Sequence, residues 1–164
     1  MTTRTFVPWV EPFAQELRSG RHEVVRTARK LLPEHWSLPS PLEGWTYKDL
    51  LAHLATGDWL FQTVLGAVVA NEPIDLALIN ADSVNAGNAQ RVEERKATSV
   101  DALIAEVETE GEKTQELLSR LSEAHEGLTQ GGAPMSMADA LRAFPGHDRG
   151  HLAQLKTALD NVML

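Results

Sequence analysis

The sequence predicts an all-α fold, an antiparallel four-helix bundle, in a single domain that spans residues 1–164. Apolar residues recur at the helical spacing of three and four along most of the chain. Runs of alternating β-branched residues, which are typical of strands, are missing. A chain of 164 residues with 43% hydrophobic content is long enough to bury one core. Two long linkers, about residues 33–45 and 71–98, permit crossover connections between the helices.

The first helix is expected over residues 10–32, because its apolar stripe stops at Pro33. A proline-rich loop follows. The second helix is expected over residues 46–71, and its start is marked by a capping box. In this box the Thr46 hydroxyl accepts from the backbone of Asp49, whose carboxylate reaches back to the backbone of Thr46.

The third helix is clear over residues 99–122, where apolar residues keep the helical spacing. Residues 76–91 either begin this helix or form a short separate one. A glycine-rich turn over residues 127–134 ends this part of the chain.

The fourth helix is expected over residues 136–159, with a second capping box between Ser136 and Asp139. Pro145 interrupts this stretch and is followed by Gly146. Because proline lacks a backbone N–H and clashes with the preceding turn, we expect a kink or a break there.

Charge and composition exclude several classes of function. The formal net charge is -8 and the basic residues are scattered, which argues against a nucleic-acid partner or an anionic membrane surface. No apolar run reaches the ~18 residues of a membrane span, and the N-terminal residues carry no apolar leader. Without cysteine, disulfides and thiolate ligands are excluded. By elimination, we expect a cytoplasmic protein.

Three histidines interrupt otherwise apolar stripes. His147 and His151 lie four residues apart, so their Cβ atoms share one helix face at ~6 Å. His53 lies on the apolar face of the second helix. Three imidazoles from two helices suit Zn, Ni, Fe or Cu and leave coordination positions open. Alternatively, each histidine is a core residue that is hydrogen-bonded to a neighbour, and spacing alone leaves both interpretations open.

Other polar residues have two interpretations. One interpretation is that Asp49 and Asp148 orient the imidazoles through hydrogen bonds to the ring nitrogens that do not bind the metal. The other is that Asp49 caps its helix and that Asp148 pairs with an arginine. Asp58 is a further candidate to face the site, and Trp45 is expected to pack at the helix entrance or to form a pocket wall. The remaining histidines lie beside charged residues or in a loop and are expected on the surface: His22, His35 and His125.

Two segments resemble a known family. Residues 44–54 read GWTYKDLLAHL and are similar to the second-helix signature of the DinB-like (YfiT-like) superfamily. Residues 144–155 read FPGHDRGHLAQL and resemble the last-helix segment of the same group. Asn85 and Asn88 resemble its asparagine-containing third helix. The superfamily includes the N-terminal domain of mycothiol-dependent maleylpyruvate isomerase.

The resemblance implies a four-helix bundle that binds a divalent metal, Zn or Ni with Fe as an alternative, through His53, His147 and His151. Isomerase-type members often have glutamate where His147 stands, and this departure favours the all-histidine DinB-like branch. Those isomerases also carry a further C-terminal domain, for which 164 residues leave no room.

The resemblance also implies a small-molecule substrate, a homodimer and a reaction that depends on a thiol. Because the chain has no cysteine, the thiol would be a low-molecular-weight one such as mycothiol or bacillithiol, used by an S-transferase or an isomerase. The alternatives are a metal-dependent hydrolase and a non-catalytic bundle that sequesters a small molecule. A structural protein with packed histidines ranks last, because burying three imidazoles without partners is costly.

Overall fold

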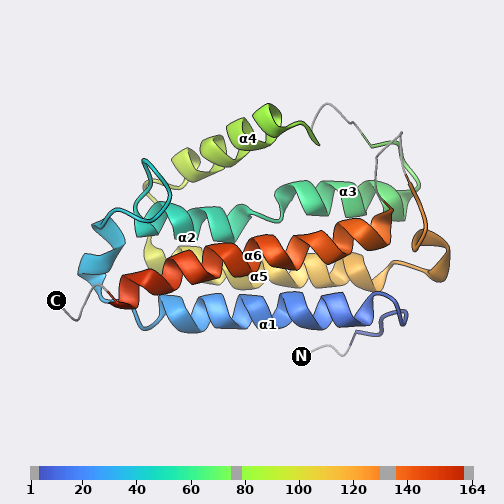
Figure 1. The fold of residues 1–164 in the computed structure, drawn as a ribbon, viewed down its shortest axis with the longest axis horizontal. Coiled ribbons are helices and arrows are strands. Elements are labelled where there is room, and N and C mark those ends of the chain that lie inside the picture. Colours follow the sequence, from blue (N-terminus) through green and yellow to red (C-terminus); the bar gives the residue numbers. More distant parts are fainter. Residues whose placement is uncertain (1–3, 75–78, 130–135, 161–164) are drawn as a thin grey trace.

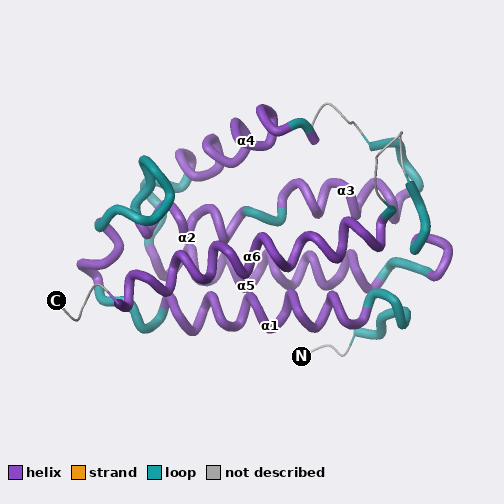
Figure 2. The backbone as a smooth tube through the Cα atoms, in the orientation of Figure 1, coloured by secondary structure: helices purple, strands orange, loops and turns teal. Residues whose placement is uncertain are grey.

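The computed structural model describes residues 4–74, 79–129 and 136–160, and within them the chain is helical (Figure 2). These ranges contain no strand, only an isolated bridge between Pro39 and Thr46. None of the described helices has the length and hydropathy needed to cross a bilayer. The helices are α1 (Glu11–Ala28), η1 (Pro33–Ser37), α2 (Tyr47–Thr56), α3 (Trp59–Ala70), α4 (Ala81–Glu94), α5 (Val100–Ser119), η3 (Glu123–His125) and α6 (Met137–Asp160).

The bundle consists of α1, the pair α2 and α3, α5, and α6, whereas α4 lies outside it and packs on α2 (Figure 1). The colour gradient shows that α1 and α6 run in one direction, and that α2, α3 and α5 run in the other. The all-α four-helix bundle is therefore confirmed. The connection through α4 is a crossover, because it returns the chain to the end of the bundle from which α2 started.

The second predicted helix is in fact two helices, α2 and α3, separated by Gly57 and Asp58. Arg21, on α1, donates to the carbonyl oxygen of Leu54 in the last turn of α2 and also to the Asp58 carboxylate. In a continuous helix that carbonyl would accept from the backbone of Asp58. The guanidinium thus satisfies an acceptor at the break, which explains why an apolar pattern without proline is interrupted there.

Of the two alternatives for the last helix, the break is wrong, because α6 runs without interruption through the buried Pro145. The kink stays a prediction. Packing against α1 and α2 holds the helix together despite the missing donor. One half of the second capping box is confirmed, since the Ser136 hydroxyl accepts from the Asp139 backbone at 3.2 Å. The Asp139 carboxylate accepts from the same hydroxyl at 2.8 Å.

The segment before α5 forms the separate helix α4, so the second of the two alternatives is confirmed. Asn80 begins α4 by accepting from the Ser83 backbone, and Ser99 begins α5 by accepting from Ala102. Part of the expected connection, residues 75–78, and most of the glycine-rich turn, residues 130–134, lie outside the described residues.

The buried apolar residues form two clusters, one around α2 and one around α3. Four buried polar residues separate them and are here called the polar layer: Arg21, Asp58, Thr114 and Asp148. Each lies, along its own part of the chain, between residues of one cluster and residues of the other. The polar layer therefore crosses the middle of the bundle, at the level where α2 gives way to α3.

Candidate metal centre

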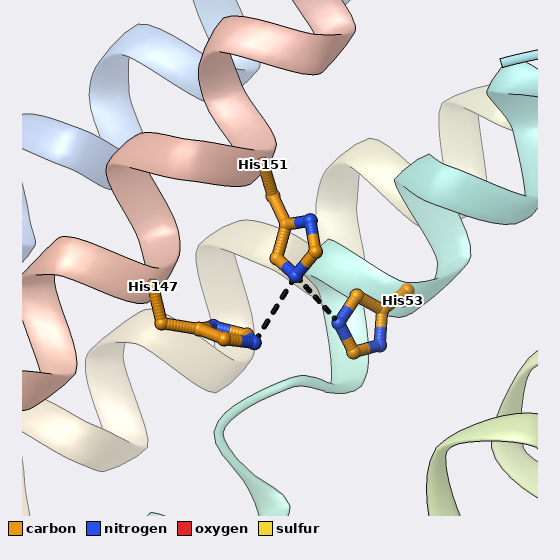
Figure 3. A group of neighbouring side chains, drawn as sticks. All are labelled: His53, His147 and His151. Carbon is orange, nitrogen blue, oxygen red and sulfur yellow. Dashed lines mark hydrogen bonds between the residues drawn. The ribbon is translucent and has the colours of Figure 1, made fainter. Parts of the chain in front are cut away.

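The structure brings together the three histidines that the sequence singled out (Figure 3). His53 comes from α2, and His147 and His151 come from successive turns of α6. The Nε2 atom of His151 lies 3.2 Å from that of His53 and 3.1 Å from that of His147. One ring nitrogen from each residue lies within 4.8 Å of the others.

This spacing fits a shared metal ion. Two nitrogens bound to zinc at about 2.1 Å, at angles between octahedral and tetrahedral, are about 3.0–3.4 Å apart. The two measured Nε2 separations, 3.1 and 3.2 Å, fall within this range. The third pair, His53 with His147, is bounded only by the 4.8 Å that encloses all three ligand atoms, so these two rings must lie within about 4.2 Å of each other to hold one cation together with His151.

Hydrogen bonds among the three rings satisfy the ring nitrogens less well than a shared metal ion would. The Nδ1 atom of His151 lies 2.7 Å from Oε1 of Gln154, a carbonyl oxygen that can only accept. The Nδ1 atom of His151 therefore carries the proton, and its Nε2 atom presents a lone pair to the two other rings. A single in-plane lone pair accepts one good hydrogen bond, so a cation would satisfy this convergence better than protons.

Burial keeps two of the rings uncharged. It lowers the pKa of His53 to about 3, and the neighbouring His151 and His147 add to this effect. Burial also lowers the pKa of His151. Both side chains are therefore neutral at neutral pH, the protonation state in which an imidazole can bind a metal.

The three rings differ in exposure, which leaves one side of the cluster open. His53 is buried in α2, against the ring of Trp45 at a centroid distance of 5.2 Å. His151 is half-buried and His147 is exposed. The predicted packing of Trp45 at the helix entrance is confirmed by this contact. The Nδ1 atom of His53 is buried and has no hydrogen-bond partner among the described residues.

Gln154 is a site residue to which the sequence reasoning assigned no role. It lies three residues after His151, and this spacing places both side chains on one helix face. The signal was present in the sequence, but only the structure shows that the carboxamide oxygen faces the ring. By fixing the tautomer of His151, Gln154 directs the Nε2 lone pair to the centre of the cluster.

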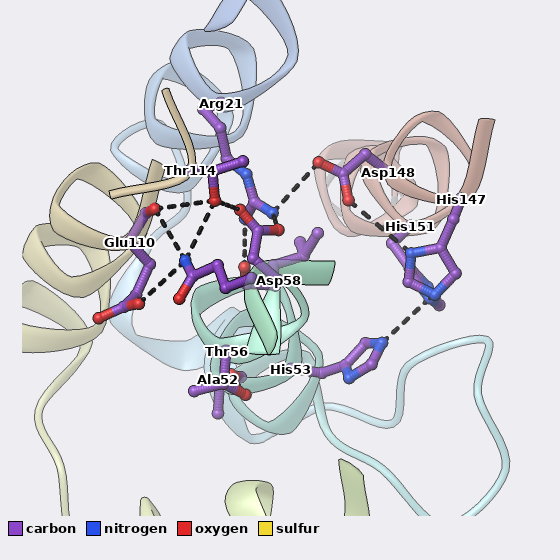
Figure 4. Close-up of polar contacts among 12 residues, drawn as sticks. Arg21, Ala52, His53, Thr56, Asp58, Glu110, Thr114, His147, Asp148 and His151 are labelled. Atoms are coloured by element: carbon purple, nitrogen blue, oxygen red, sulfur yellow. Dashed lines mark hydrogen bonds and ion pairs between the residues drawn. The ribbon is translucent and has the colours of Figure 1, made fainter. Parts of the chain in front are cut away.

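Asp148, the member of the polar layer on α6, lies between Arg21 and His147 (Figure 4). Its Oδ2 atom is 3.2 Å from Nη2 of Arg21, without hydrogen-bond geometry, and its Oδ1 atom is 3.8 Å from Nδ1 of His147. Burial alone would raise the pKa of Asp148, but the Arg21 guanidinium and the His147 imidazole hold it below its ordinary value. The expected arginine partner is confirmed; an orienting role toward His147 stays a prediction.

Asp49 lies one turn before His53 on α2, but its hydrogen bonds go to Thr46 and Lys96 and to none of the three histidines. It accepts from the Thr46 backbone at 3.0 Å and from Nζ of Lys96 at 2.8 Å. Burial alone would raise the pKa of Asp49, but these hydrogen bonds from Lys96 and Thr46 lower it. The capping interpretation is therefore confirmed, and the structure shows no contact through which Asp49 could orient a ligand.

Asp58 is buried in the polar layer rather than beside the histidine rings. It accepts from Arg21 and, at 2.7 Å, from the hydroxyl of Thr114 (Figure 4). Burial raises the pKa of Asp58, while Arg21 opposes this and the Asp148 carboxylate reinforces it. The expectation that Asp58 faces inward is confirmed, but its partner is an arginine.

The surface prediction for the other histidines is only partly correct. His22 is exposed and His125 is half-buried, but His35 is buried in η1. The Nδ1 atom of His35 accepts from the backbone N–H of Leu32 at 2.9 Å. The imidazole thus caps a short helix, a role that a loop position in the sequence did not reveal.

Two cavities meet at the histidine cluster. One, of about 380 Å³, is lined by His53, His147 and His151 together with Leu42, Glu43, Trp45, Asn85 and Asn88. The other, of about 340 Å³, extends from His53 and His147 between α3, α4 and α6. Small molecules could therefore approach the three Nε2 atoms from two directions.

Comparisons with known proteins agree with this fold. The family model described as the mycothiol maleylpyruvate isomerase N-terminal domain matches residues 17–147. The crystal structure of the mycothiol-dependent maleylpyruvate isomerase is similar at a TM-score of 0.70 and 19% identity, and that of its histidine-to-alanine variant at 0.71 and 18%. In both cases 94% of this chain is covered and 63% of the isomerase chain. No curated protein matches significantly.

Proposed function

Because the chain belongs to the mycothiol maleylpyruvate isomerase N-terminal domain family, we propose that it is a divalent-metal-dependent enzyme with His53, His147 and His151 as ligands. The observation that carries the proposal is that the Nε2 atom of His151 lies at the spacing of a shared ion from those of both His53 and His147. Zinc or nickel is the proposed metal, with iron as the alternative. The histidine at position 147, although it favours the DinB-like branch, does not exclude the chain from this family.

A divalent cation at such a site lowers the pKa of a thiol or water that it binds, so that a nucleophile forms at neutral pH. The chain contributes the rest of the site. Gln154 holds His151 in the tautomer that leaves Nε2 free, and burial keeps His53 neutral. The two cavities give a nucleophile and an electrophile separate approaches to the same point.

A thiol-dependent S-transferase or isomerase is the reaction class that we favour. The chain has no cysteine, so the nucleophilic sulfur would come from a low-molecular-weight thiol such as mycothiol or bacillithiol. The structurally similar isomerase is described as mycothiol-dependent, and this supports the choice. The homodimer and the cytoplasmic location stay predictions.

The metal content of tag-free protein tests the proposal. Elemental analysis should find one divalent ion per chain, and the His151→Ala variant should lose it. His22→Ala is the matched control, because His22 is exposed on α1 and should leave the metal content unchanged. Full metal occupancy in the His151→Ala protein would show that the three-histidine site is wrong.

A non-catalytic, sequestering bundle is the second candidate, and the apolar character of the 340 Å³ cavity favours it. Removal of the metal with a chelator separates the two. If the protein is an enzyme, consumption of a thiol and an electrophile stops when the metal is removed. If ligand binding survives with the helices intact by circular dichroism, and no turnover is seen with metal restored, the sequestering function is correct.

A further inference from the structure

An apolar cleft leads directly to the histidine cluster. It lies between α3, α4 and α6 and has a volume of about 340 Å³, which falls in the range of small-molecule pockets. His53 and His147 form its inner end. Most of the remaining lining is apolar: Trp59, Leu60, Phe61, Val64, Val84 and Phe144.

Among the described residues, the cleft lining has no side chain that could balance a charged ligand. No described lysine, arginine, aspartate or glutamate lines the cleft, and its polar lining residues are His53, His147 and Asn88. The Oδ1 atom of Asn88 accepts from Nε1 of Trp59 at 2.8 Å. Arg91 lies 4.0 Å from the Trp59 ring but lines other cavities and not this one. A carboxylate placed along these walls, away from the histidines, would therefore lose its hydration without gaining a partner.

The walls of the cleft include aromatic rings that are closely packed against neighbouring groups. The rings of Phe61 and Phe144 stack at 4.1 Å with planes 11° apart, and the Phe144 and His147 rings follow at 6.4 Å and 19°. On the opposite side α4 approaches Trp59 so closely that a Cβ atom on Gly87 would lie 2.8 Å from Cζ2 of the indole. Flat aromatic walls favour a ligand that is itself flat and apolar.

We propose that this cleft binds an uncharged, apolar group of aromatic size, and that the substrate of the site is a neutral hydrophobic molecule rather than a dicarboxylate. The part of the proposal that places the reacting atom beside the histidines rests on the proposed metal-dependent function. The specificity of the cleft rests on its lining alone. Apolar contact drives the binding, and the lack of a charged partner along the described walls disfavours an anionic group away from the histidines.

A pair of fluorescent probes that differ by one sulfonate tests the charge preference. N-phenyl-1-naphthylamine is uncharged, and 8-anilinonaphthalene-1-sulfonate is its anionic counterpart. Titrated into the metal-loaded full chain, the neutral probe should bind tighter by about tenfold or more. Equal or tighter binding of the sulfonate would overturn the proposal.

Two substitutions on α6 test whether the probe binds in the cleft. Ala140 lines the cleft, so Ala140→Phe should fill it and weaken the neutral probe by about tenfold. Ala153 is exposed on the same helix outside the cleft, and Ala153→Phe is the matched control that should bind like the original protein. Undiminished binding by a folded Ala140→Phe protein would show that the probe lies elsewhere and would overturn the proposal.

A substitution that increases binding of the anionic probe provides a further check, because a misfolded variant would not show such an increase. Ala143→Arg adds a cation at the rim of the cleft and should raise the affinity for the sulfonate probe, whereas Ala153→Arg should not. Equal gains in both variants would contradict the assignment. Metal content is measured in each protein. If the protein binds metal but does not prefer the neutral probe, only the cleft inference is wrong. If the protein prefers the neutral probe but does not bind metal, only the metal-dependent function is wrong.

Discussion

Two groups of polar side chains lie side by side at the middle of the bundle, and they differ in how completely their polar atoms find partners within the protein (Figure 4). In the polar layer a guanidinium faces two carboxylates, and Asp58 also accepts from Thr114. In the histidine cluster three Nε2 atoms converge, and two of the rings are held neutral by burial. The first group is largely satisfied within the protein, whereas the second group lacks a central partner.

The difference indicates separate roles for neighbouring residues. A paired buried network ties α1, α6 and the α2–α3 break together and is difficult to alter without unfolding. An unbalanced convergence of lone pairs is the arrangement expected of a binding site for a cation. Asp148 connects the two, because it lies 3.2 Å from Arg21 and 3.8 Å from His147. A cation bound by the histidines would add positive charge beside a layer that has two carboxylates for one guanidinium.

The largest expected effect comes from breaking the polar layer. Arg21→Ala leaves Asp58 and Asp148 buried without a cation, so the free energy of unfolding should fall by about 3–5 kcal/mol. Urea unfolding followed by circular dichroism measures the loss. Arg18→Ala is the matched control, because Arg18 is exposed on the same helix and should change stability by less than about 1 kcal/mol. A similar small loss for both variants would refute the structural role of the layer.

A smaller effect is expected where the histidine cluster meets its support. Gln154→Leu removes the acceptor that fixes the tautomer of His151, and metal affinity should fall by about 10–100-fold. Competition with a chromogenic chelator gives the affinity, while the unfolding curve of the metal-free protein should change little. Gln90→Leu, on the exposed face of α4, controls for the loss of a carboxamide. Unchanged affinity in the Gln154→Leu protein would mean that His151 needs no fixed tautomer.

The smallest effect is expected from Asp49, a carboxylate that belongs to neither group. Its pKa is lowered in the folded state, so its contribution to stability is present above the unfolded value of about 3.9 and disappears as the pH falls through the folded pKa. Asp49→Asn should therefore cost about 1 kcal/mol at pH 7 and nearly nothing in strong acid. Urea unfolding of both proteins across this pH range measures the difference. A cost that is independent of pH would contradict the ion pair with Lys96.

Sequence pattern was most informative where structure depends on neighbours along the chain. The capping box at Thr46 and the hydroxyl cap at Ser136 were recognisable because each uses residues only three apart. The convergence of His53 with the last helix was predictable because each histidine interrupts an apolar stripe, and stripes turn toward a common core.

The errors occurred where a distant group decides the local conformation. The break before α3 depends on Arg21, which lies more than thirty residues earlier and caps the Leu54 carbonyl from another helix. Pro145 remained inside α6 because packing against neighbouring helices outweighed the loss of one hydrogen bond. His35 became buried because its ring accepts from the Leu32 backbone in a short helix.

The amino-acid sequence by itself determined the helical class, the starts of α1, α2, α5 and α6, and the three histidines, because each follows from periodicity and from contacts within one turn. Only the tertiary structure decided that the Nε2 atoms of His53 and His151 meet at 3.2 Å, since this distance depends on how α2 and α6 pack. It also decided which carboxylates are paired with Arg21 and where the apolar cleft lies. These features involve residues from separate helices, and their spacing along the chain carries no information about the final distance.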